Sequence, residues 1–359
     1  MTSTGARPGA SGEPVSAAES LARGCDWLAV QIDVRGRIQD SELAVVYYKS
    51  PAILALNGRM DVATRCLGWI EERFLGAQGE LAIPEDQECG NPFNAYDRGW
   101  VCWGALLCGR YDLAFRLADD IRTYQDPATG GFWDSRAART SGQGRQHAMS
   151  AGMAGIALLA TRHLEEAERA ARFIVRVLEL QPDRDQGLFF ALEAGPGGAR
   201  LKTEKTAIDY LDCCGLKQRP GRLGPILVLL TRLYRVTRDR TYLEAARAYT
   251  RAMLAGGEGA YLCVEGHKFV WGMTELDGVE PGADSAAYGA ATDRIVAYVA
   301  GRQQPDGQWH ADAGVTDPAK EQPLFWRIDT TCNVLVGLMH YCWAKQNPRK
   351  ASRPVGPVY

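Results

Sequence analysis

Residues Gln304-Pro-Asp-Gly-Gln-Trp309 form the stretch that decides the fold, because related turns recur along the chain. Each turn has a glycine followed two positions later by an apolar or aromatic residue, and all but the fifth have a glutamine before the glycine. A recurrence every forty to fifty residues or so indicates a repeat architecture. The turn glycines are Gly36, Gly79, Gly131, Gly187, Gly259 and Gly307, separated by 43, 52, 56, 72 and 48 residues.

Between the turns, apolar residues recur at three- and four-residue spacing, which predicts about twelve helices in six pairs. The helix before each turn is amphipathic, as in residues 164–180, whereas the helix after it is more apolar and rich in Gly, Ala and Ser, as in residues 147–161. A helix that is apolar nearly all round must be buried on most sides. The pattern therefore predicts an all-α fold, an (α/α)6 toroid with six outer and six inner helices. An open helical solenoid is the alternative, and six repeats without capping repeats favour closure.

The ends of the chain differ in composition from its middle. Residues 1–18 are rich in Gly, Ser, Pro and Ala and lack the apolar core of a signal peptide, which predicts a disordered leader. Residues 19–346 are predicted to form a single toroid domain, followed by a C-terminal tail at 347–359. Within the domain, the glycine-rich segment 193–200 is predicted to be a loop that could act as a lid, and residues 207–216 are predicted to be helical.

Composition excludes several function classes. The chain has 359 residues, a formal net charge of -2 and 23% charged residues, without the basic stripe of a nucleic-acid-binding protein. It has no apolar run long enough to span a membrane. Its ten cysteines form no C-x-x-C pair, which favours a reducing cytoplasmic location without disulfides or zinc. Dinucleotide-binding, nucleophile-elbow and histidine-rich metal motifs are also missing from the sequence, so we expect an enzyme without a cofactor or metal.

The Q-x-x-x-G-x-W pattern resembles the QW motifs of squalene–hopene cyclases and the wider terpenoid cyclase and prenyltransferase toroids. Gln304–Trp309 and Gln125–Trp133 are the best matches, and the resemblance covers about residues 20–345 as architecture. The Asp-x-Asp-Asp-Thr acid motif of these cyclases is matched only by Asp329 and Thr330, and their D-D-x-x-D diphosphate motif does not occur. The resemblance therefore implies the toroid and the cyclase class without the usual proton donor.

In a toroid the inner helices run in the same direction, so their N-terminal ends open onto one end of the barrel. Polar and aromatic residues at these starts predict a small-molecule pocket, although helix capping would explain several of them equally well. The candidate catalytic residues are Asp97, His147, Asp209, Asp212 and Asp329. The candidate substrate-binding residues are Tyr48, Lys49, Tyr96, Arg98, Trp100, Lys205, Tyr210, His267, Lys268, Trp271, Trp326 and Arg327.

Three functions are compatible with such a pocket. The first is a cofactor-independent cyclase or isomerase for a hydrophobic small molecule, a terpenoid- or polyketide-type intermediate, with Asp97, Asp209 or Asp212 as a desolvated acid. The faces of Trp100 and Trp271 would then stabilise developing positive charge. The alternative is a carbohydrate-active enzyme, either a glycoside hydrolase with two carboxylates or a sugar epimerase that uses histidines. A non-catalytic ligand-binding scaffold is the third.

Overall fold

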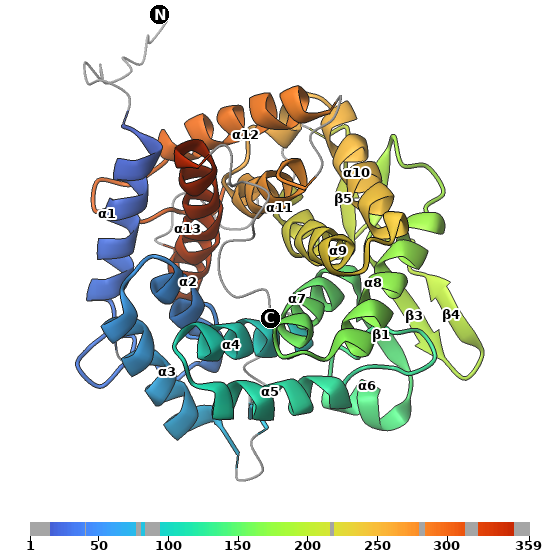
Figure 1. Ribbon diagram of the computed structural model, residues 1–359, viewed down its shortest axis with the longest axis horizontal. Coiled ribbons are helices and arrows are strands. Elements are labelled where there is room, and N and C mark those ends of the chain that lie inside the picture. The colour runs from blue at the N-terminus through green and yellow to red at the C-terminus, as the bar shows by residue number, and fades with distance from the viewer. Residues whose placement is uncertain are drawn as a thin grey trace, which may run out of the picture.

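The computed structural model describes residues 15–39, 41–76, 80–82, 94–215, 219–279, 284–312 and 322–347. Within these residues, six helix pairs form two concentric rings around one axis, so the predicted all-α (α/α)6 toroid is confirmed (Figure 1). The outer helices are α1 (Ala17–Val30), α3 (Met60–Phe74), α5 (Tyr111–Thr123), α8 (Leu164–Glu179), α10 (Arg240–Ala255) and α12 (Ser285–Ala300). The inner helices are α2 (Ser50–Leu56), α4 (Asn94–Leu107), α7 (Ala148–Ala160), α9 (Leu223–Thr237), α11 (His267–Asp277) and α13 (Leu324–Gln346).

The two rings differ in burial as their composition requires. Every residue of the inner helix α7 is buried, including its small residues Gly152 and Gly155. A Cβ at Gly152 would lie 2.7 Å from the Pro225 carbonyl carbon of α9, so the glycine permits close approach of neighbouring inner helices. The outer helix α8 buries a single stripe of Ala, Phe, Ile, Val and Leu and exposes its charged face.

The inner ring is closed. Each inner helix packs on the next, and α13 packs on α2, which in turn packs on α4. The outer helix α12 also contacts α1, so the last repeat meets the first. These contacts exclude the open solenoid.

The first, third and sixth recurrent turns contact the next outer helix, and at the third turn the glycine concerned is Gly130 and not the predicted Gly131. Gly130 and Gly307 have φ values of +80° and +105°, and a Cβ at either would approach a backbone carbonyl oxygen of the next outer helix, at Arg169 (2.3 Å) and Arg23 (2.6 Å) respectively. The Gln125 side chain donates to the Glu166 carbonyl of α8 (2.9 Å). Glycine is needed at these turns for both conformation and space.

At the sixth turn the equivalent glutamine is Gln303 and not Gln304 as the motif suggests. The Gln303 side-chain amide donates to the Ser20 carbonyl of α1 (2.9 Å), whereas Gln304 donates only to the nearby Arg302 carbonyl (3.3 Å). Trp309 is fully buried and donates from Nε1 to the Val299 carbonyl (2.8 Å). The opening stretch therefore fastens the last repeat to the first.

Helix ends agree with the sequence at some places and differ at others. The Ser16 side chain accepts from the Glu19 amide and caps α1, and Gly58, just past α2, has a φ of +76°. The predicted first inner helix at 41–58 is only partly helical, because it divides into the 3-10 turn η1 (Ala44–Val46) and α2. The remaining short helical elements are α6 (Arg136–Ser141), η3 (Pro220–Arg222), η4 (Glu258–Ala260) and η5 (Val264–Gly266).

The chain also contains two small antiparallel sheets that the sequence did not predict. Strands β1 (Gly144–His147), β3 (Ala191–Gly195) and β4 (Gly198–Leu201) form one, and β2 (Gly187–Phe189) pairs with β5 (Tyr210–Asp212) in the other. The loop prediction for 193–200 is therefore wrong, since most of it is the β3–β4 hairpin. The helix prediction for 207–216 is also wrong, because β2 supplies a strand partner for Tyr210–Asp212. None of the described helices is both long enough and apolar enough to cross a lipid bilayer.

Candidate functional site

The N-terminal ends of inner helices bring five polar side chains together, which we call the lysine cluster: Tyr48, Lys49, Tyr96, Lys268 and Asp329. Tyr48 and Lys49 precede α2, Tyr96 and Lys268 lie in the first turns of α4 and α11, and Asp329 lies in the second turn of α13. Lys49 forms an ion pair with Asp329, and Tyr48 Oη donates to Asp329 Oδ1 (2.6 Å). Lys268 Nζ donates to Tyr96 Oη (2.9 Å). These contacts join segments more than 170 residues apart in the sequence.

Burial makes the electrostatics of the lysine cluster strong. Burial raises the pKa of Asp329, but the Lys49 and Lys268 ammonium groups outweigh this effect and hold that pKa below its usual value. Burial and the neighbouring Lys49 charge together lower the pKa of Lys268 well below 10.5. Burial also raises the pKa of Tyr96 to about 12, so this phenol keeps its proton at neutral pH. Asp329 is thus favoured as an anion, whereas burial and the Lys49 charge disfavour the charged form of Lys268.

A second carboxylate lies near the same tyrosines. The rings of Tyr48 and Tyr96 meet edge to face, with centroids 6.1 Å apart. Burial raises the pKa of Tyr48 well above its usual value, and the charges of Asp329 and Asp97 raise it further. Asp97 and Asp329 therefore both act on the tyrosine pair, from α4 and α13, and Asp97 is half-buried. Of the five predicted catalytic residues, these two are brought to the lysine cluster.

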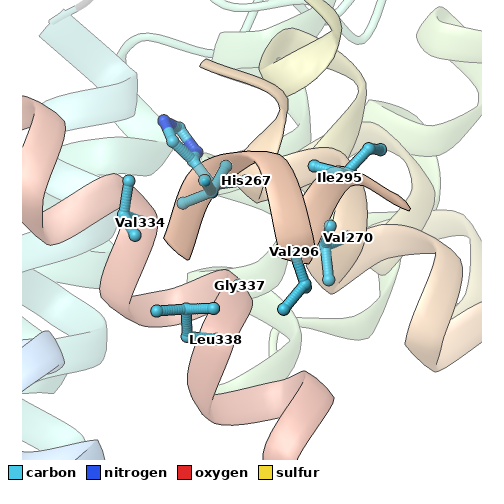
Figure 2. A pocket seen from close by; sticks show the side chains of 8 residues that line it. His267, Val270, Ile295, Val296, Val334, Gly337 and Leu338 are labelled. Carbon is cyan, nitrogen blue, oxygen red and sulfur yellow. The ribbon is translucent and has the colours of Figure 1, made fainter. Parts of the chain in front are cut away.

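His267 begins α11 beside Lys268 and is buried. It borders a small apolar pocket among α11, α12 and α13 that has no room for a water molecule. Figure 2 shows the imidazole ring pointing away from the pocket side chains Val296 and Leu338. The backbone amide of Lys268 donates to His267 Nδ1 (2.6 Å). Burial, Lys268 and Lys49 lower the pKa of His267, so the ring is neutral and carries its proton on Nε2.

Aromatic rings fill the inner ring below the lysine cluster. Tyr96, Trp100 and Trp103 lie on one face of α4, at the i, i+4 and i+7 positions. The Trp103 and Trp271 rings stack with centroids 5.4 Å apart and an interplanar angle of 7°. Trp100 contacts both, at 5.6 Å and 6.0 Å. The predicted binding residues Trp100 and Trp271 are thus fully buried in a stack under the cluster.

A second charged group lies deeper along the same helices, and we call Arg232, Arg235, Trp271 and Glu275 the Glu275 cluster. The Glu275 carboxylate accepts from Arg232 Nη2 (2.6 Å), Arg235 Nη1 (3.1 Å) and Trp271 Nε1 (3.1 Å). Burial raises the pKa of Glu275, but the Arg232 and Arg235 charges outweigh it and lower the pKa to about 2. This cluster was not predicted from the sequence, although charges inside otherwise apolar helices are a signal for it.

Asp209 and Asp212 do not share a helical face, contrary to the sequence interpretation. Asp209 is buried and accepts from Arg145 Nη1 (2.9 Å), and Arg145 also forms an ion pair with Asp134. Asp212 ends β5 and is exposed, where its Oδ1 accepts from the Cys214 amide (2.9 Å). Arg145 and Asp134 were not predicted, because only the β-sheet brings them to Asp209.

His147 links β1 to α7. Its Nδ1 accepts from the Met149 amide (3.1 Å) and so caps α7, while Nε2 lies 3.2 Å from the Ile208 carbonyl. Burial lowers the pKa of His147 well below 6.5, so the neutral ring donates from Nε2 to Ile208. Both ring nitrogens thus have backbone partners.

Three other predicted binding residues, Arg98, Lys205 and Tyr210, have their contacts outside the lysine cluster. Arg98 is fully buried between the inner and outer rings of helices, with its Nε 2.7 Å from Asp120 Oδ2 of α5. Lys205 is exposed over the Tyr210 ring, and Tyr210 packs on Phe189 of β2. The two residues at the start of α13, Trp326 and Arg327, are half-buried. Glu88 and Asn91, polar residues that precede the second inner helix in the sequence, lie outside the described residues.

Among the described residues, one group has metal-ligand character. Ligand atoms of Cys263, Glu265 and Asp312 lie within 4.8 Å of one another, next to the start of α11. Cys263 Sγ donates to Glu265 Oε2 (2.9 Å), and Asp312 Oδ2 accepts from the Val264 amide (2.5 Å). Burial raises the pKa of both the Cys263 thiol and the Glu265 carboxyl. A metal ion bound here would have to displace the thiol proton.

The solved structures that are similar to this chain include enzymes that act on glycans. An α-1,6-mannanase of glycoside hydrolase family 76 from Salegentibacter sp. HEL1_6 aligns over 91% of this chain and 99% of its own, at 12% identity and a TM-score of 0.62. The unsaturated glucuronyl hydrolase of Bacillus sp. GL1 aligns over 96% and 99%, at 13% identity and a TM-score of 0.64. A family 76 mannosidase, Bt3792 of Bacteroides thetaiotaomicron VPI-5482, aligns over 92% of this chain and 99% of its own, at 15% identity and a TM-score of 0.61. No protein-family model and no curated protein sequence matches the chain.

These likenesses correct the functional interpretation. The toroid expected from the terpenoid cyclase resemblance is confirmed, but a relation to those cyclases is not, because the structures above are glycoside hydrolases. The cyclase or isomerase assignment is therefore wrong, and so is the hydrophobic substrate. An inactive mannanase variant was solved with α-1,6-mannotetrose, which is an oligosaccharide.

That mannanase variant carries alanines in place of two adjacent aspartates. Two adjacent aspartates occur once in this sequence, at Asp119-Asp120. They lie on the outer helix α5, where Asp120 pairs with Arg98. The chain therefore does not present an adjacent aspartate pair at the inner ring, and its carboxylates there come from separate helices.

Proposed function

We propose that this chain is a carbohydrate-active (α/α)6 enzyme, a glycoside hydrolase that uses Asp97 and Asp329. The observation that carries the proposal is the presence of two carboxylates, from α4 and α13, acting on one buried tyrosine pair. Glycoside hydrolysis requires two carboxyl groups on either side of the scissile bond, one to protonate the leaving oxygen and one to remain anionic.

The surroundings of the two carboxylates differ as those roles require. Asp329 accepts from Tyr48 Oη and Asn333 Nδ2 (2.9 Å) and pairs with Lys49, and its lowered pKa keeps it anionic at neutral pH. It suits the role of the base, nucleophile or stabiliser of an oxocarbenium-like transition state. Asp97, half-buried and on a different helix, is left for the acid role.

The epimerase alternative is less well supported. It requires histidines that face the substrate with a free nitrogen. Both ring nitrogens of His147 are occupied by the backbone of Met149 and Ile208, so the lysine cluster has beside it a single histidine nitrogen without a partner in the described structure, His267 Nε2. A hydrolase with a carboxylate pair accounts for more of the charged residues at the inner-helix starts.

The test is hydrolysis of a panel of glycosides that includes α-1,6-linked mannooligosaccharides and unsaturated glucuronyl disaccharides. Because general acid and base groups each contribute about 10²–10⁴-fold, Asp97→Asn and Asp329→Asn should each lower kcat by that factor. Released sugar is measured by chromatography, and circular dichroism checks that each variant is folded. Asp97→Asn is the decisive variant, since Asp329→Asn also breaks the pair with Lys49.

The matched control is Asp61→Asn, which changes an exposed carboxylate on the outer helix α3 that pairs with Arg65. It should leave kcat unchanged. Full activity in a folded Asp97→Asn variant would remove the acid role, and failure of every glycoside to react would remove the hydrolase assignment.

A further inference from the structure

Lys268 stands out among the charges of the inner ring. Its side chain is buried, with 7% of the residue exposed, and its Nζ donates to a neutral acceptor, Tyr96 Oη. Within the described residues no carboxylate oxygen lies within ion-pair distance of Lys268, whereas Lys49 contacts Asp329 directly. A buried ammonium group with one neutral partner has two further N–H donors without acceptors.

A second unused donor lies beside it. His267 Nε2 is buried and has no hydrogen-bond partner in the described structure. Since Nδ1 accepts from the Lys268 amide, Nε2 carries the proton and is a donor. Both Lys268 and Lys49 lower the pKa of His267, so the ring is within electrostatic reach of the lysine cluster. Unused donors on two adjacent residues require an acceptor, and a buried cation favours an anionic one.

The charges around Lys268 are on balance unfavourable to its protonated form. Positive charges at Lys49 and Arg222 lower the pKa of Lys268 after burial has lowered it, and the negative charges raise it too little to compensate. The titratable groups that act on Lys268 or on its neighbours in the described structure are Tyr48, Lys49, Tyr96, Asp97, Arg222, Glu265, His267 and Asp329. A bound anion would supply the missing counter-charge and make protonation of Lys268 favourable.

We propose that the lysine cluster binds the carboxylate of an acidic saccharide, a uronate, through the Lys268 ammonium group and the His267 Nε2–H. This inference rests on the proposed carbohydrate function and narrows its substrate class from glycans in general to anionic ones. The Tyr96 ring lies beside Lys268, with its centroid 5.4 Å from Nζ, and supplies an aromatic surface next to the ammonium group.

The test compares binding of glucuronic acid, glucose and acetate by isothermal titration calorimetry at neutral pH. Wild-type protein should bind glucuronic acid at least about 10-fold more tightly than glucose, because a charge-assisted hydrogen bond contributes that much. Lys268→Met should abolish the preference for glucuronic acid over glucose. The matched control is Lys345→Met at the far end of α13, where Lys345 is exposed and pairs with Asp293 (2.7 Å), and it should keep the preference.

A measurement on the wild type does not depend on folding of a variant. Binding of glucuronic acid should be accompanied by proton uptake at Lys268, seen as a change in binding enthalpy between buffers of different ionisation enthalpy, and glucose should show none. Equal affinity for glucose and glucuronic acid, or acetate binding as tight as that of glucuronic acid, would overturn the uronate site. Cleavage of neutral glycosides that depends on Asp97 would, in that case, leave the hydrolase assignment intact.

Discussion

The lysine cluster and the Glu275 cluster are both buried and both built on α11, yet they pair their charges differently. In the Glu275 cluster, two guanidinium groups contact one carboxylate directly, and an indole N–H completes its hydrogen bonds. In the lysine cluster, only Lys49 contacts the carboxylate, while Lys268 contacts a phenol. Each cluster has two cations and one carboxylate. In the Glu275 cluster both cations contact the carboxylate, whereas in the lysine cluster only one of them does.

The difference indicates different roles. Paired buried charges fix how helices pack, and removing one partner is costly. A buried charge without a counter-charge is kept where a ligand or a reaction needs it, and perturbed pKa values gather at such sites. We therefore assign the deep cluster to stability and the cluster at the inner-helix starts to function.

The largest effect on stability is expected from Glu275→Ala. The change leaves Arg232 and Arg235 buried without their carboxylate and should lower the free energy of unfolding by about 3–5 kcal/mol. Urea denaturation measures the loss. Glu244→Ala is the control, since Glu244 is half-exposed on α10 and its pairs contribute about 0–1 kcal/mol. A loss no greater than the control's would mean that the deep cluster does not stabilise the ring.

The next effect is a loss of stability in acid, from Glu275 and the neighbouring His340. Burial lowers the pKa of His340 from 6.5 to about 3, so the unfolded chain binds a proton there first as the pH falls below 6.5. The pKa of Glu275 is lowered from 4.5 to about 2, so the unfolded chain also binds that proton first, below pH 4.5. Both groups therefore destabilise the fold as the pH falls, together by a few kcal/mol between about pH 6.5 and 3.

Melting temperatures across this pH range measure the effect. His340→Phe keeps a ring that can stack on Trp271 and should flatten the curve between pH 6.5 and 4.5. His163→Phe, at the start of the outer helix α8, should leave the curve unchanged. An unchanged slope in His340→Phe would assign the acid sensitivity to other groups.

The fold was predictable because each repeat is marked by a short motif of neighbouring residues. Glycines such as Gly36 and Gly307 are required by their φ values and by a neighbouring carbonyl, so the turns they form recur visibly in the sequence. The helix prediction for residues 207–216 was wrong because the hydrogen-bond partners of this segment are distant in the sequence. Arg222 donates to the carbonyl of Tyr210 (3.1 Å) and also to that of Ala207, and β2 pairs with Tyr210–Asp212. No local pattern carries this information.

The candidate site was predictable only in part. Its residue types stand at the inner-helix starts, so Lys49, Lys268 and Asp329 were found from the toroid geometry. Which charges pair was not predictable, because Lys49 and Asp329 are separated by 280 residues. The cyclase interpretation failed for a related reason, since the recurrent turn is a fastening between outer helices and the same fold carries unrelated chemistries.

The smallest effect on stability, and the sharpest test of the comparison, is expected from Lys268→Met. Methionine keeps the apolar stem and removes a cation whose lowered pKa disfavours the folded state at neutral pH. Loss of the hydrogen bond to Tyr96 offsets part of that gain, so the free energy of unfolding should stay unchanged or rise by up to about 1 kcal/mol. Lys49→Met, which leaves the Asp329 carboxylate without its ion-pair partner, should instead lower the free energy of unfolding by several kcal/mol. If urea denaturation gave equal losses of unfolding free energy in the two variants, Lys268 would be a structural charge like Lys49 and not a binding group for an anion.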